Sequence, residues 1–341
     1  MCWFVVPPLL TRTPASQLAE DTVIRLLNSK VTVRQRKNFA ERCVANLKAG
    51  VSVFQSLRVL RRIIDLVPRT ATRANIMTQT TIVEGLNERE HLLEMFFSDL
   101  RSYHDTAKAQ LLPAEGMAVP DPDNAVVADG VGHLRQINTR FDFLYFVLRC
   151  SPLTISTEQA LLLWDCLVAD AISPAEVTAT LGWLRKACRS QWQGFVGSTM
   201  FADGAAEALF TSRMIEGDHR CPMSKVGFEC LRAFFVLVNE AEGRLKRVGA
   251  SKDEVEVQVL PSELVGLQAV WRVALEAKDA LVAKQAIGLL NALHNNLGQT
   301  VADKACEVQQ TYLQVGVCAR GAWYDHGARE PHTSQPLRRL A

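Results

Sequence analysis

Cysteine and histidine are the residues of this sequence with the clearest potential for chemistry, because a thiolate can attack a carbonyl and both side chains bind metals. The chain has nine cysteines and seven histidines. No Cys-x-x-Cys pair or Cys/His cluster gives metal-ligand spacing, and most cysteines lie in apolar helical runs, as Cys166 does. We therefore expect buried, reduced thiols in a cytoplasmic protein, with no metal and no other cofactor.

The histidines offer no better candidates. His91 and His104 fall in one apparent helix, but they are too far apart for two ligands on the same helical turn. We expect surface or helix-cap positions for both. The signature motifs of phosphate binding, serine hydrolysis, zinc proteolysis and dinucleotide binding are missing from the sequence. We therefore predict no catalytic, cofactor-binding or metal-binding residues.

A small basic face contains Arg58, Arg61 and Arg62, with Arg69 and Arg73 nearby. Such a face could meet an acidic partner or a phosphate. No aromatic residues interleave with these arginines, so a solvated helix face is the favoured interpretation. The residues that bind a partner are unknown from the sequence alone.

The large aromatic residues fall at helical spacing on apolar faces. Phe228, Phe234 and Phe235 form one such group, and Trp164 and Trp271 lie in other apolar runs. Side chains of this size contribute most when they are buried. We expect all five to pack in the core and not to line a groove.

The composition limits the kinds of partner. Hydrophobic residues make up 48% of the chain and charged residues 22%, which is typical of a globular protein. Lysine and arginine total 38 against 36 acidic residues, so no overall field favours nucleic acid or an anionic membrane. The apolar opening 1–10 lacks a basic start and contains two prolines, which argues against a signal peptide. No apolar run reaches the ~18 residues of a membrane span, so we expect protein partners.

Apolar residues recur mainly every three or four positions, which predicts helices. Around Phe54, Leu57, Leu60 and Ile64, charged residues fill the positions between the apolar ones, as in a helix with one buried stripe. Similar stripes occupy 16–28, 34–49, 86–104, 132–150, 156–170, 174–189, 222–243, 262–277 and 279–297. Convincing alternating strands are absent, so the predicted class is all-α.

Residues at several expected helix starts support these boundaries. Ser156, three positions before Gln159, suits a capped start, and Ser173 before Pro174 suits an N-cap followed by proline at the first helical position. Pro261 is expected to open another helix.

The Pro/Gly/Asp-rich stretch 111–131 is the clearest break in the pattern. It predicts an N-terminal helical unit at 1–110 and a C-terminal helical scaffold unit at 132–318, and we expect a disordered tail at 319–341. Helices of similar length joined by short turns favour a HEAT- or armadillo-like α-solenoid of stacked antiparallel helices. No motif recurs at a fixed period, and a compact helical bundle stays an alternative.

Three parts of the sequence together resemble the long helical region upstream of the catalytic domain in the Fat facets-like ubiquitin-specific proteases. Segment 140–148, followed by 161–167, is similar to a helix pair with a Trp-x-Cys-Leu core. Segments 227–239 and 242–245 are similar to a phenylalanine-rich helix ending in Val-Asn and then Glu-Gly-Arg-Leu. Segment 264–275 carries the most specific match, Gly-Leu-x-x-x-Trp-Arg-Val.

The resemblance covers about residues 135–300 and implies an interaction scaffold of a large ubiquitin-specific protease. Such a scaffold would position ubiquitinated substrates or regulators for a cysteine-type catalytic domain elsewhere. That family's cysteine box, Asn-x-Gly-Asn-Thr-Cys, surrounds none of the cysteines here, and the segment 324–327 only superficially resembles its histidine box. The alternatives are a free-standing HEAT-like adaptor with no enzyme attached and, less favoured, a thiol enzyme of another type.

Overall fold

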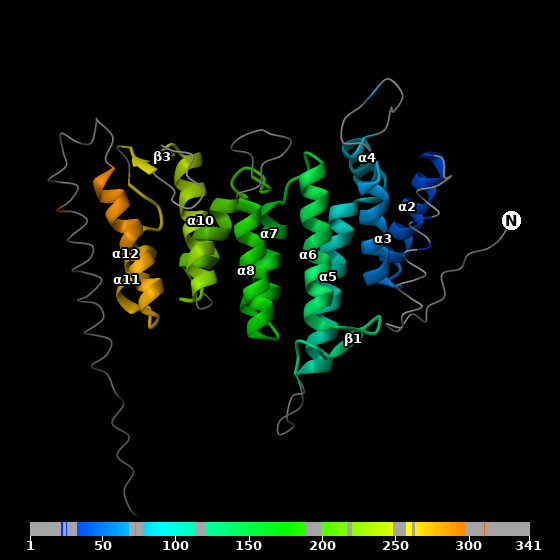
Figure 1. Ribbon diagram of the computed structural model, residues 1–341, viewed down its shortest axis with the longest axis horizontal. Helices are drawn as coiled ribbons and strands as arrows, with labels where there is room; N and C mark the ends of the chain where they lie inside the picture. Colours follow the sequence, from blue (N-terminus) through cyan, green and yellow to red (C-terminus); the bar gives the residue numbers. More distant parts are fainter. Residues whose placement is uncertain are drawn as a thin grey trace, which may run out of the picture. The chain divides into compact units, whose positions relative to one another are not determined.

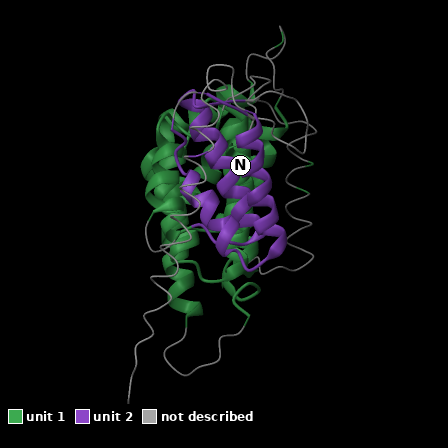
Figure 2. Cartoon of the chain, turned by 90° about the vertical axis from the view of Figure 1, so that its left-hand side faces the viewer, with its two compact units in different colours: residues 1–220 green, residues 221–341 purple. Residues whose placement is uncertain are grey.

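The computed structural model describes residues 33–67, 78–112, 121–188, 199–216, 220–247, 257–260 and 263–296, with four isolated positions at 22, 25, 72 and 310. The chain forms two compact units, residues 1–220 and residues 221–341 (Figure 2). Helices dominate the described part of both units, which confirms the predicted all-α class. The break predicted at 111–131 lies inside the first unit, and the division into 1–110 and 132–318 stays a prediction. The tail 319–341 lies outside the described residues.

The described part of the first unit is a succession of helices (Figure 1). The α-helices in its described ranges are α2 (Val33–Lys48), α3 (Val53–Asp65), α4 (Gln79–Glu90), α5 (Leu92–Leu111), α6 (His133–Cys150), α7 (Thr157–Trp164), α8 (Pro174–Cys188) and α9 (Ala205–Leu209). Two π-helical turns, η1 (Asp165–Ala169) and η2 (Phe210–Ile215), continue α7 and α9. Helix α2 packs on α3, α3 on α6 and α6 on α8, so that neighbouring helices stack as in an armadillo-like solenoid.

A short antiparallel hairpin joins α5 to α6. Its strands are β1 (Val126–Ala128) and β2 (Val131–Gly132). The two residues between them, Asp129 and Gly130, both have left-handed backbones with φ of 54° and 65°. Asp-Gly is the pair that such a two-residue turn favours. The Asp129 carboxylate also accepts a hydrogen bond from the Phe54 N–H at 3.0 Å, which fixes the hairpin to the start of α3.

The described part of the second unit contains three helices and one hairpin. The helices are α10 (Lys225–Ala241), α11 (Leu267–Glu276) and α12 (Ala280–Asn295), and strands β3 (Leu245–Arg247) and β4 (Val257–Val259) pair antiparallel. Helix α12 packs on both α11 and α10. The buried Asn239 amide donates to the Phe235 carbonyl at 2.8 Å and the Val265 carbonyl at 2.9 Å, and its oxygen accepts from the Val265 N–H at 2.9 Å. This side chain therefore fixes the approach to α11 against α10.

The apolar stripes point into the core as the sequence predicts. In α3, Phe54, Leu57, Leu60 and Ile64 are all buried. Four of the five aromatic side chains assigned to packing, Trp164 and the phenylalanines of α10, are also buried. The exception is Trp271 in α11, which is only half-buried.

Two of the predicted helix starts are confirmed. The Ser156 hydroxyl accepts from the Gln159 N–H at 3.3 Å and the Gln159 side chain accepts from the Ser156 N–H at 3.1 Å, which completes a capping box before α7. Helix α8 begins at Pro174, and the Ser173 hydroxyl accepts from the Glu176 N–H at 3.2 Å.

Two helix predictions differ from the structure, and one short helix has no predicted counterpart. The stripe at 86–104 is two helices, because α4 ends and α5 begins at His91. The helix expected to open at Pro261 begins at Leu267, after Gly266 with φ of 82°. Helix α9 was not predicted, since its five residues are too short to show a period. The stripe at 16–28 lies outside the described residues except for Thr22 and Arg25, which are helical.

Candidate functional site

The junction between α4 and α5 places a residue with a left-handed backbone beside an open pocket. His91 has φ of 53° and ψ of 50°, a conformation that costs a residue other than glycine roughly 1–2 kcal/mol. Its N–H donates to the Asn87 carbonyl at 2.9 Å, which closes α4. The Asn87 side chain then accepts from the Leu93 N–H at 3.1 Å in the first turn of α5. His91 is thus at a helix cap, as predicted.

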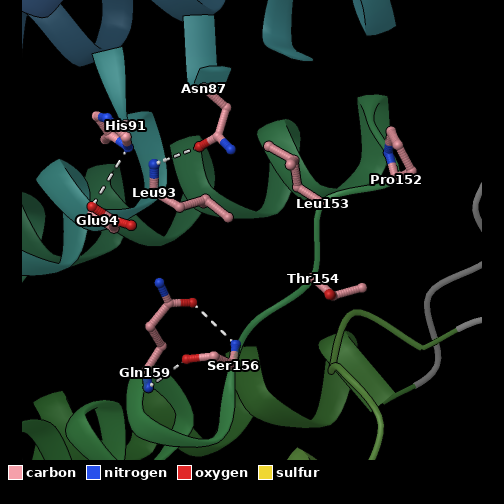
Figure 3. A pocket seen from close by; sticks show the side chains of 9 residues that line it. All are labelled: Asn87, His91, Leu93, Glu94, Pro152, Leu153, Thr154, Ser156 and Gln159. Atoms are coloured by element: carbon pink, nitrogen blue, oxygen red, sulfur yellow. Dashed lines mark hydrogen bonds and ion pairs between the residues drawn. The ribbon is translucent and has the colours of Figure 1, made fainter. Parts of the chain in front are cut away.

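The opposite side of this pocket is the connection from α6 to α7 (Figure 3). It runs through Pro152 and ends at the capping box of Ser156 and Gln159. The pocket has a volume of about 300 Å³, at the lower end of the range for ligand sites. Its lining residues are Asn87, His91, Leu93, Glu94, Pro152, Leu153, Thr154, Ser156 and Gln159.

Glu94 is the only carboxylate among the nine lining residues, and one of its oxygens lies 3.7 Å from Nδ1 of the His91 imidazole. Both side chains are largely exposed, so solvent weakens this pair. Leu93 is buried and supplies an apolar floor. The lining contains no thiol. Its arrangement of one carboxylate, apolar side chains and hydrogen-bonding groups is suited to binding.

A second, more polar hollow of about 510 Å³ lies between the β1–β2 hairpin and the exposed side of α6. Its lining includes Asp123, Arg135, Asn138 and Asp142. The carboxylate of Asp142 lies 3.7 Å from the guanidinium of Arg61. Opposite charges around one hollow give it no preference for a strongly charged ligand.

The described part of the basic face is partly engaged in contacts of its own. Arg58 lies over the Phe54 ring at 5.5 Å, and Arg61 lies over the Phe146 ring at 5.7 Å. Arg69 and Arg73 lie outside the described residues.

The described cysteines are poorly suited to nucleophilic attack. None of them is in a disulfide, and all are buried except the half-buried Cys166. Burial raises the pKa of the Cys43 and Cys221 thiols to about 12, and it also raises the pKa of Cys166. A thiol with a raised pKa holds little of the reactive thiolate at neutral pH. Cys2, Cys306, Cys318 and the segment 324–327 lie outside the described residues.

His104 corrects the expectation of a surface or cap position, because it is buried in the middle of α5. Its Nε2 lies 3.9 Å from Oε1 of Glu176, and the Nε2 of buried His133 lies 3.3 Å from the same oxygen. Tyr103 completes this group, since its hydroxyl is 3.0 Å from Nδ1 of His133. The Glu176 Oε2 accepts from the Ile172 N–H at 2.6 Å.

This buried cluster joins α5, α6 and α8, and its members are separated by up to 73 positions between Tyr103 and Glu176. Local sequence patterns could not find it, because each residue alone looks like an isolated polar position in a helix. No group of three or more His, Cys, Asp or Glu residues in the described ranges could hold a metal ion.

We expect the cluster to make the stability of the first unit depend on pH. Burial lowers the pKa of His104, while Glu176 and then Asp170 act in the opposite direction, with smaller effects from His133 and Asp105. The unfolded chain, with a histidine pKa of about 6.5, therefore takes up a proton before the folded chain does. Stability should fall as the pH drops below about 6.5.

Urea unfolding at several pH values between about 5 and 8 measures how the free energy of unfolding depends on pH. The His104→Gln variant should flatten this dependence, because it removes the imidazole whose pKa burial lowers. An unchanged slope in His104→Gln would mean that other groups control the pH dependence.

None of the helices in the described ranges combines the length and apolar character needed to cross a membrane.

Comparison with known proteins identifies the region. A family model described as the UBP24/USP9X/USP9Y ARM repeat matches residues 15–239. The probable ubiquitin carboxyl-terminal hydrolase FAF of Drosophila melanogaster is 25% identical over 288 residues, which is 82% of this chain and 10% of that protein. Human ubiquitin carboxyl-terminal hydrolase 9Y is 23% identical over 272 residues, or 77% and 10% of the two chains. Human ubiquitin carboxyl-terminal hydrolase 24 is 22% identical over 236 residues, or 68% and 8%.

The chain spans about a tenth of the length of these relatives. The family match begins at residue 15, so it includes the N-terminal helices, where the sequence showed no family motif. It continues into α10, ends at residue 239 and covers well over half of the 341 residues. The chain therefore belongs to the UBP24/USP9X/USP9Y ARM repeat family.

Proposed function

We propose that this chain is a non-catalytic interaction scaffold of a large ubiquitin-specific protease, in which it positions substrates or regulators for a catalytic domain elsewhere. The observation that supports this most is the match of residues 15–239 to the ARM repeat region. Stacked helical repeats form extended surfaces that bind other proteins. We place the scaffold in the cytoplasm, where thiols stay reduced.

The chain alone should not cleave ubiquitin conjugates. Hydrolysis by a cysteine enzyme needs a thiol of lowered pKa, a positioned histidine and donors for the oxyanion. Burial acts on Cys43, Cys166 and Cys221 in the opposite direction. We expect no turnover of a fluorogenic ubiquitin substrate and no labelling by a ubiquitin vinyl-sulfone probe.

The matched control for that assay is the same chain with all nine cysteines replaced, and a known deubiquitinase shows that the reagents work. Turnover above the cysteine-free chain, or covalent labelling of any cysteine, would contradict a non-catalytic role.

The positioning role is tested by attaching the full chain to a ubiquitin-specific protease catalytic domain. Tethering raises the effective concentration of a bound substrate. A subset of ubiquitinated cell proteins should therefore lose ubiquitin at least about 10-fold faster with the tethered catalytic domain than with the catalytic domain alone. Mass spectrometry of ubiquitin-remnant peptides measures this. The catalytic domain with the attached chain and the catalytic domain alone should act equally on the fluorogenic substrate. Identical rates on every cell protein would refute positioning and leave the free-standing adaptor as the better interpretation.

A further inference from the structure

Among the described residues, the connection between α6 and α7 is an extended segment that pairs with another strand-like segment on one edge only. Ile155 forms a parallel bridge with Phe201. Its N–H donates to the Met200 carbonyl at 2.9 Å, and its carbonyl accepts from the Ala202 N–H at 2.9 Å. Both polar groups of Ile155 therefore face the 200–202 segment.

In an extended backbone, successive residues direct their N–H and C=O groups to opposite edges. Thr154 and Ser156 consequently face away from Met200. The Ser156 N–H donates to Gln159, a residue that lines the 300 Å³ pocket, so this second edge is on the pocket side. No hydrogen bond joins the N–H or C=O of Thr154 to any described residue.

Figure 3 shows that the Thr154 side chain points away from Glu94 and Gln159 across the pocket. Thr154 nevertheless lines this pocket, so its contribution there is the backbone. An open pair of N–H and C=O groups is the template on which an added strand pairs. Beside it, Leu93 and Leu153 offer apolar surface, and Glu94 is the only carboxylate of the lining.

We propose that this pocket binds an extended peptide segment of a partner protein, which adds a strand to the open edge at Thr154. The peptide backbone exchanges two hydrogen bonds with Thr154. One of its apolar side chains rests on Leu93 and Leu153, and a neighbouring lysine or arginine faces Glu94. The proposal rests on the scaffold function and names the class of partner that one of its surfaces takes.

The test begins with a phage-displayed library of random linear heptapeptides, selected on the immobilised full chain. We expect enriched peptides in which an apolar residue stands close to a basic one. The best of them is then synthesised with a fluorophore and titrated by anisotropy. Enrichment no greater than on a blank surface would overturn the proposal.

A pair of variants at Thr154 separates backbone from side-chain recognition. Thr154→Pro removes a donor that bonds to no described residue, so the fold should survive while the dissociation constant rises at least about 10-fold. Thr154→Ala keeps the N–H, and its dissociation constant should stay within about 2-fold of the original. Equal binding by Thr154→Pro and the original chain would refute strand addition. Equal loss in Thr154→Ala would assign recognition to the side chain.

Two further measurements keep the test independent of the folding of the proline variant. In the first, the backbone nitrogens of the peptide are methylated one at a time. Methylation of the nitrogen that pairs with Thr154 should abolish binding. Unchanged binding after methylation of every nitrogen would contradict strand pairing. Glu94→Gln should weaken peptides with a basic residue about 3-fold and leave their neutral analogues unchanged. Equal effects on both peptides would remove Glu94 from recognition.

Failure here is distinguishable from failure of the scaffold function. If the tethered catalytic domain favours the same cell proteins with Thr154→Pro as with the original chain, the scaffold acts through another surface and the pocket proposal is wrong. If the tether confers no preference at all, the scaffold function itself is wrong.

Discussion

Arg140→Ala should lower the free energy of unfolding of the first unit by about 3–5 kcal/mol. Arg140 of α6 is almost fully buried. Its Nε donates to the Asp99 carboxylate at 3.0 Å, its Nη1 donates to the Gln136 side chain at 2.8 Å, and its guanidinium lies 4.1 Å from the centre of the Tyr103 ring. Alanine removes all three contacts and leaves the largely buried Asp99 carboxylate without its cation.

The large loss of stability comes from leaving the Asp99 charge buried without a partner, and not from the net interaction energy of the ion pair. Replacing both members by apolar residues of similar volume removes the charge and its desolvation cost together. We therefore expect Arg140→Met combined with Asp99→Leu to recover most of the stability that Arg140→Ala loses. Urea unfolding followed by circular dichroism measures both variants.

The chain offers an exposed ion pair as a control. Lys48 and Glu90 are 2.6 Å apart on the surface of the same unit. Solvent screens this pair, so Lys48→Ala should change stability far less than Arg140→Ala does. Losses of similar size at Lys48 and Arg140 would mean that burial does not set the cost, which would contradict this account of Arg140.

Much of this fold can be predicted from local sequence, because periodicity and helix caps depend on residues a few positions apart. The stripe of α3 and the capping box of Ser156 are both of this kind. The split at His91 is not, since the apolar spacing continues across it while the backbone turns left-handed. Only three-dimensional packing decides that such a residue ends a helix.

The pocket at the α4–α5 junction could not be predicted from the sequence, for a related reason. The pocket joins residues 87–94 to residues 152–159, and the edge at Thr154 exists only because Ile155 pairs with Phe201. Neither relation leaves a local pattern. Arg140 shows the same limit, because its ion pair with Asp99 spans 41 positions. An arginine within an apolar helix can equally extend into solvent, so the sequence alone gave no sign of its burial.

Gly227→Ala should destabilise the second unit by about 3 kcal/mol, although alanine is the better helix former. Gly227 lies in the first turn of α10, where its N–H donates to the N-cap Ser224 hydroxyl at 3.1 Å. A Cβ atom at this position would lie 1.9 Å from the carbonyl oxygen of Pro222. The Pro222 oxygen belongs to the backbone, so this steric clash can be relieved only if the 222–224 turn and the capping contact at Ser224 shift.

Gly288→Ala is the matched control for this prediction, because Gly288 lies in helix α12 of the same unit and an added Cβ there meets nothing within 4 Å. Helix propensity is then the main effect, and we expect the free energy of unfolding to rise by about 0.5–1 kcal/mol. The two variants make the same chemical change with opposite signs of effect, so unfolding of the full chain in urea separates packing from propensity. Hydrogen exchange should localise the loss in Gly227→Ala to α10. A neutral or stabilising Gly227→Ala would mean that the Pro222 carbonyl does not approach α10 as closely as the structure places it.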